Sequence, residues 1–166
     1  GRFNLDREWF QYSRKQGISF ADFEKLVAPE ISKGGNFSYD YKGEYYSTTK
    51  IYGYIKRNDI NEDYRFWLAL LNSQLFWFFI QSTGYVLRGG YYTFKTDYIN
   101  PFPIPKTIPA KIHDDVIKVV NIILDMKAQN IENDISKFQN LINKSIYSLY
   151  NLDEKDIVEI ESLNYI

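Results

Sequence analysis

Cysteine is absent from this chain of 166 residues, and histidine occurs once, at position 113. Without cysteine, the chain can form neither a disulfide nor a thiolate metal site. A single histidine argues against a histidine-based metal centre and against a catalytic triad. The sequence also contains no phosphate-binding glycine loop and no nucleophile-elbow serine. We therefore expect no catalysis of these kinds in this chain.

Long hydrophobic runs are also missing. The segment from Trp67 to Phe79 is largely apolar, but Asn72-Ser73-Gln74 interrupts it. A membrane-spanning helix needs about 20 apolar residues, so we expect a buried helix here and no membrane contact. No signal peptide is visible, and the lack of cysteine fits a cytoplasmic location. The chain begins at Gly1 without a methionine, which suggests a fragment of a larger protein.

Aromatic residues, in contrast, are dense: 3 Trp, 15 Tyr and 12 Phe. We expect most of them in the core and a minority on a ligand-facing surface. The formal net charge is only −1, but its distribution is uneven. Residues 1–110 hold 14 Lys/Arg against 11 Asp/Glu, and residues 111–166 hold 6 against 10. An anionic partner should therefore meet the first part of the chain.

Local patterns predict an α+β fold, with a mixed β-sheet and a buried helix. We expect a short helix over 5–16 and strands over 23–31, 37–41 and 45–55. A turn at Lys42-Gly43 should join the last two strands as a hairpin. Asn61-Glu62-Asp63 should cap the buried helix, which we expect to run to about residue 81.

Four prolines from Pro101 to Pro109 predict an extended connector. Beyond it, apolar residues recur at helical spacing in two segments that meet near Gln129-Asn130. We expect these segments to form a C-terminal antiparallel helical hairpin. A short last helix should be capped by Asp153. The predicted regions are thus an α+β domain over 1–107 and a helical region over 108–166.

The stretch from Thr83 to Pro105 contains the strongest candidate binding site. Arg88, Tyr91, Tyr92 and Lys95 combine cations with stacking rings, and Gly89-Gly90 lets the backbone approach a partner or simply shapes a turn. Side-chain alternation along a strand should turn one of the two tyrosines inward. We expect this loop to bind a polar, anionic partner.

Four further cations are candidate phosphate contacts: Arg14, Lys15, Lys33 and Lys50. For Lys50, as for Lys95, a solvated strand lysine is the alternative interpretation. The sequence Asn100-Pro101-Phe102-Pro103 lacks the adjacent prolines and following aromatic of an adenine-methyltransferase motif. Because Gly89-Gly90 is also not expected between a strand and a helix, no AdoMet site is predicted.

Several motifs resemble, in their order and spacing, the TaqI-like C-terminal specificity domain of type II restriction–modification methyltransferases, including the fused type IIG enzymes. The resemblance covers nearly the whole chain. The matching pieces are Trp9 with Arg14-Lys15-Gln16-Gly17, then residues 25–31, 36–40, 45–48, 68–73, 87–94, 101–105 and 149–152.

The resemblance implies a sequence-specific recognition module for double-stranded DNA in a bacterial restriction–modification enzyme. It also implies an upstream adenine-N6 methyltransferase domain, missing from this chain, that holds AdoMet and flips the target adenine out of the duplex. In some members a nuclease is fused further upstream. The chain itself would need no cofactor, and its terminal helices would dock onto partner domains.

The residues by themselves also allow a different function. The dense aromatic residues and the helical hairpin are compatible with a protein–protein interaction module. A positive stripe across the sheet loops would favour DNA, whereas a large apolar patch there would favour a protein partner.

Overall fold

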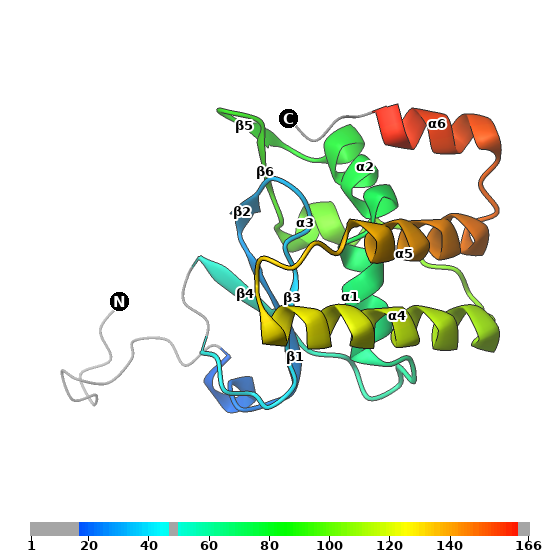
Figure 1. Ribbon diagram of the computed structural model, residues 1–166. Coiled ribbons are helices and arrows are strands. Elements are labelled where there is room, and N and C mark those ends of the chain that lie inside the picture. Colours follow the sequence, from blue (N-terminus) through cyan, green and yellow to red (C-terminus); the bar gives the residue numbers. More distant parts are fainter. Residues whose placement is uncertain (1–16, 47–49, 163–166) are drawn as a thin grey trace, which may run out of the picture.

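The computed structural model describes residues 17–46 and 50–162. Two small antiparallel sheets lie on one side of the molecule, and helices pack on the other (Figure 1). The α+β fold class is therefore confirmed, with the sheet divided in two. The helix predicted over 5–16 lies outside the described residues, as does the middle of the strand predicted over 45–55.

In the described part of the chain, a short 3₁₀ helix and four strands come first, two helices and two further strands follow, and four helices come last. The elements are η1 (Ile18–Phe20), β1 (Lys25–Pro29), β2 (Ile31–Ser32), β3 (Ser38–Asp40), β4 (Ile51–Tyr54), α1 (Tyr64–Leu71), α2 (Gln74–Thr83), β5 (Val86–Leu87), β6 (Tyr91–Thr93), α3 (Thr96–Ile99), α4 (Ala110–Gln129), α5 (Ser136–Leu149) and α6 (Glu154–Ser162).

The first sheet has the strand order β3-β1-β4, and the second has the order β2-β6-β5. In the first sheet, β1 pairs with β3 on one side and with β4 on the other. The predicted hairpin between the strands at 37–41 and 45–55 is therefore wrong. The connection over residues 41–50 is longer than the 2–5 residues usual in a hairpin loop, so the chain can pass to the far side of β1 before it re-enters the sheet.

The long buried helix predicted over 61–81 is divided into α1 and α2. Asp63 caps α1 as predicted, because its side chain accepts a hydrogen bond from the Arg65 N–H at 2.8 Å. Ser73 then caps α2, and its hydroxyl accepts from the Phe76 N–H at 3.2 Å. The polar Asn72-Ser73 pair, which looked like a mere interruption, thus ends one helix and begins the next.

One hydrophobic core joins the strands to α1, α2, α4 and α5. Phe66, Phe76 and Phe94 are fully buried in it, and the same cluster includes Val116 of α4 and Ile146 of α5. The α4 and α5 helices lie side by side and antiparallel (Figure 1). The predicted helical pair is therefore confirmed, with its connection at residues 130–135. None of the helices over the described ranges is long and apolar enough to cross a membrane.

Candidate nucleic-acid interface

The β5–β6 hairpin forms one edge of the second sheet, and Arg88 stands at its tip. The strands pair through Leu87 and Tyr91, which leaves Arg88-Gly89-Gly90 as the loop. The Gly90 N–H donates to the Leu87 carbonyl at 3.2 Å. Gly89 and Gly90 have φ angles of 83° and 76°, a region that favours glycine. The two glycines therefore make the turn that holds Arg88 out into solvent.

The two adjacent tyrosines point to opposite sides of β6. Tyr92 packs edge-on against Trp77, with ring centroids 5.2 Å apart. Tyr91 remains 45% exposed. This is the arrangement that strand alternation predicts, and it leaves Tyr91 as the tyrosine available to a ligand.

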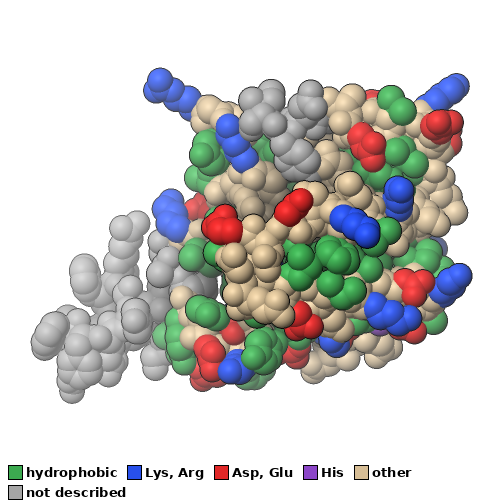
Figure 2. Space-filling model, in the orientation of Figure 1, with side chains coloured by type: hydrophobic (Ala, Val, Ile, Leu, Met, Phe, Trp, Pro, Cys, Tyr) green, Lys and Arg blue, Asp and Glu red, His purple; other side chains and the backbone are tan. Residues whose placement is uncertain are grey.

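Lys33 approaches this hairpin from the turn after β2. Its Nζ lies 5.3 Å from the centroid of the Tyr91 ring, within the range of a cation–π contact. A Cβ built on Gly90 would lie 3.9 Å from the same Nζ. Lys33, Arg88 and Tyr91 therefore form one exposed cluster, which we call the hairpin cluster. Lys and Arg side chains project at the corner of the molecule where β5 and β6 lie (Figure 2).

Lys50 and Lys95, the two candidate lysines expected on strands, flank the carboxylate of Glu30. Glu30 was not among the residues predicted from the sequence. Lys50 Nζ lies 3.4 Å and Lys95 Nζ 3.8 Å from the Glu30 side chain. Burial raises the pKa of Tyr52, and the charge of Glu30 and a hydrogen bond to it raise that pKa further. Lys50 and Lys95 therefore belong to a second polar group, away from the hairpin tip. The remaining two candidates, Arg14 and Lys15, lie outside the described residues.

η1 and the loop after β3 lie at the opposite end of the molecule (Figure 1), and they carry exposed apolar side chains. We call this region the aromatic end. Its members are Ile18, Phe20, Phe23, Tyr41, Tyr45 and Tyr46. Phe20 and Phe23 stack edge-on at 5.6 Å, and the Tyr46 hydroxyl donates to Asp22.

A buried ion pair supports the aromatic end from beneath. Lys25 Nζ and Asp40 Oδ2 lie 2.6 Å apart, and each side chain is only 3% exposed. The Lys25 amine also donates to the Ala21 carbonyl at 2.7 Å. Asp40 accepts from the N–H groups of Glu44 and Tyr45, both at 3.0 Å. The pair thereby fixes two loops against each other.

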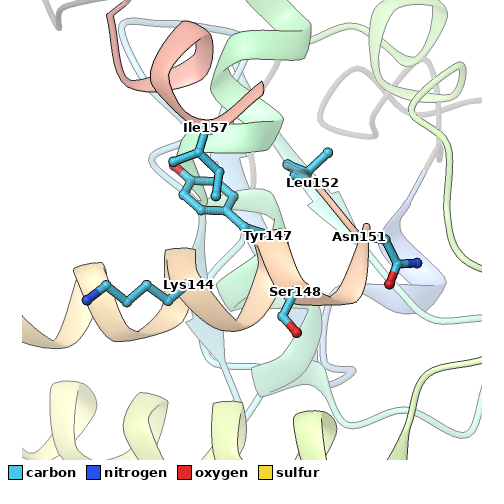
Figure 3. Close-up of a pocket in the computed structure, with 6 residues that line it drawn as sticks. All are labelled: Lys144, Tyr147, Ser148, Asn151, Leu152 and Ile157. Atoms are coloured by element: carbon cyan, nitrogen blue, oxygen red, sulfur yellow. The ribbon is translucent and has the colours of Figure 1, made fainter. Parts of the chain in front are cut away.

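An open hollow between α5 and α6 offers no comparable chemistry. In Figure 3 the Tyr147 and Ile157 side chains point toward each other, and Lys144 is the one charged residue among those labelled. Within the described part of the chain, no three His, Asp or Glu side chains gather in a way that would hold a metal ion.

The domain thus presents Arg88, Lys33 and Tyr91 as an exposed cluster at one end of its second sheet. Residues 3–104 match the model of the TaqI-like C-terminal specificity domain, and the chain belongs to this family. Members of the family are recognition domains of restriction–modification enzymes, so DNA and a methyltransferase domain are the implied partners. No curated protein matches the chain.

Proposed function

We propose that this chain recognises a specific double-stranded DNA sequence and directs an adenine-N6 methyltransferase domain to it. The hairpin cluster carries the proposal, because it places an arginine, a lysine and an exposed tyrosine together at one end of the second sheet. The methyltransferase domain, rather than this chain, would hold AdoMet. In this chain Gly89-Gly90 joins two antiparallel strands, whereas an AdoMet-binding glycine loop leads from a strand into a helix.

Each member of the hairpin cluster has a distinct role in this proposal. The Arg88 guanidinium has the geometry to donate two hydrogen bonds to a guanine edge or to a phosphate. Lys33, as a compact point charge beside it, suits a phosphate contact that sets the position of the domain on the duplex. The Tyr91 ring holds Lys33 in place and presents its own hydroxyl to the partner.

The test is an Arg88→Ala variant of the full-length protein that carries this domain. If Arg88 contacts a base, the variant should lose discrimination at one base pair, by about 1–3 kcal/mol. If Arg88 contacts a phosphate, affinity should fall for all sequences and the salt slope should decrease by about one unit. Binding titrations at several salt concentrations, with target and non-target duplexes, separate the two results. Binding of AdoMet should persist in either case.

Arg57→Ala is the matched control. Arg57 is also exposed, pairs only loosely with Asp59 at 3.2 Å, and lies on the loop before α1, far from β5 and β6 (Figure 1). This variant should bind DNA as the wild type does. Equal DNA affinity and equal site selectivity in Arg88→Ala and wild type would remove Arg88 from the interface.

The aromatic end favours a second function, contact with another protein. Among the described residues, it combines exposed rings with the acidic side chains of Asp22, Glu24 and Glu44 and with one exposed lysine, Lys42. Such a surface repels phosphates but suits a protein surface with an apolar centre and a basic rim. Because the aromatic end and the hairpin cluster lie at opposite ends (Figure 1), one domain can serve both contacts.

A further inference from the structure

Glu30 occupies the point where the two sheets meet. Its N–H donates to the Lys50 carbonyl at 2.9 Å, next to β4 of the first sheet. Its own carbonyl accepts from the Phe94 N–H at 2.8 Å, next to β6 of the second sheet. These two backbone bonds hold the junction without any contribution from the Glu30 side chain.

The carboxylate of Glu30 sits in a recess between two outward-reaching cations. The side chain is 15% exposed, whereas Lys50 and Lys95 are 76% and 55% exposed. The distances of 3.4 Å and 3.8 Å are those of loose ion pairs, and pairs with such exposed lysines contribute little to stability. The group therefore places a hydrogen-bond acceptor beside two donors on the strand-rich side of the molecule.

We propose that Glu30, Lys50 and Lys95 together read one base pair in the major groove. This inference rests on the proposed function, because it assumes that the domain binds duplex DNA. A C·G pair presents there an amino donor on cytosine beside the O6 and N7 acceptors of guanine. The Glu30 carboxylate would accept from the cytosine amino group, and a neighbouring lysine would donate to guanine.

The sign of the charge supports a base contact over a phosphate contact for Glu30. A carboxylate close to the phosphate backbone is repelled, whereas at a base edge it finds an amino group to accept from. The flanking lysines offset the repulsion as the duplex approaches. Glu30 is thus suited to specify sequence, while the hairpin cluster secures the domain on the duplex.

The experiment compares Glu30→Gln with wild type in the full-length protein. Each protein selects duplexes from a random library at low salt, and the bound sequences are counted at every position. Glu30→Gln should relax the preference at one C·G pair by roughly 5- to 150-fold and leave the other positions unchanged. Lys50→Met and Lys95→Met identify the lysine that donates to guanine. Only the variant of that lysine should weaken the preference at the same C·G pair.

Asp59→Asn is the matched control, because it removes the same charge from a carboxylate that pairs with an exposed cation, Arg57, at 3.2 Å, on the loop before α1. It should select the wild-type sequence. An unchanged preference in Glu30→Gln, or a uniform loss at all positions with lowered thermal stability, overturns the inference. A wild-type protein that selects no sequence overturns the proposed function itself, whereas a selective wild type with an unaffected Glu30→Gln overturns only the role of Glu30.

Discussion

At the scale of single residues, the Lys25–Asp40 pair is the most deeply buried ion pair among the described residues. Bringing two charges out of water costs free energy that their attraction only partly recovers, so an apolar pair often stabilises a protein as well. What an apolar pair cannot provide is directed hydrogen bonding. Here the amine and the carboxylate satisfy backbone groups in two separate loops, and this fixes the shape of the aromatic end.

Asp40→Asn should therefore be strongly destabilising, by about 3–5 kcal/mol, because it leaves the buried Lys25 charge without a counter-ion. Urea denaturation gives the free energy of unfolding. Asp59→Asn is the control, since Asp59 pairs with Arg57 on the surface and should cost less than about 1 kcal/mol. A similar loss in both variants would mean that burial adds nothing to the Lys25–Asp40 interaction.

The acid dependence of stability gives a second measurement on the same variant. Burial by itself would raise the pKa of Asp40, but hydrogen bonds from the Lys25 amine and from the Tyr45 and Glu44 N–H groups hold this pKa below 3.8. The folded-state pKa is depressed, so the stabilisation is present above the unfolded value and is lost as pH falls through the lower folded value. The difference between wild type and Asp40→Asn should thus shrink below pH 3.8.

At the scale of elements, the break between α1 and α2 links the helices to the strands. The Asn72 amide accepts from the Phe37 N–H and donates to the Phe37 carbonyl, both at 2.9 Å. Phe37 begins the segment that enters β3 and is itself buried in the core. The residue that ends α1 therefore also supplies hydrogen-bond partners for the Phe37 N–H and carbonyl, which would otherwise be unpaired at the start of β3.

Asn72→Ala should destabilise the domain by about 1–3 kcal/mol, because both backbone groups of Phe37 lose their partner. Asn143→Ala is the comparison, since the Asn143 side chain accepts one hydrogen bond, from the Gln74 N–H at 3.0 Å. Thermal unfolding followed by circular dichroism should rank Asn72→Ala as the less stable variant. The reverse order would show that the Phe37 groups find other partners.

The elements themselves could be predicted from the sequence, but their pairing could not. Apolar periodicity located β1, β3 and the C-terminal helices, because it depends only on local spacing. That β1 would lie between β3 and β4 depends on contacts between distant residues. Glu30 was missed for the same reason: its partners Lys50 and Lys95 are remote in the chain. The turn at Gly89-Gly90 and the opposite orientations of Tyr91 and Tyr92 could be predicted, because these features depend on contiguous residues.

At the scale of the whole molecule, the recognition half and the C-terminal helices form one structure through α1 and α4. Phe66 and Leu70 of α1 are fully buried, and Val116 and Val120 of α4 lie in the same core cluster. Two polar contacts cross the same boundary: Arg65 donates to Asn121 at 2.9 Å, and the Asp63 N–H donates to His113 at 3.3 Å. The helices thus complete the core of the sheet-bearing part.

A chain shortened to residues 1–109 should therefore fail to fold, because the apolar face of α1 would be exposed to water. A chain shortened to residues 1–152 loses only α6 and the residues after it, and it should remain folded with reduced stability, since Ile160 of α6 is buried.

The 166-residue chain should unfold in a single transition. The change in tryptophan fluorescence, to which Trp67 in α1 and Trp77 in α2 contribute together with Trp9, should then coincide with the loss of helical circular dichroism. Two separate transitions, or a stable 1–109 chain, would instead show that the recognition region folds independently of the helices that follow it.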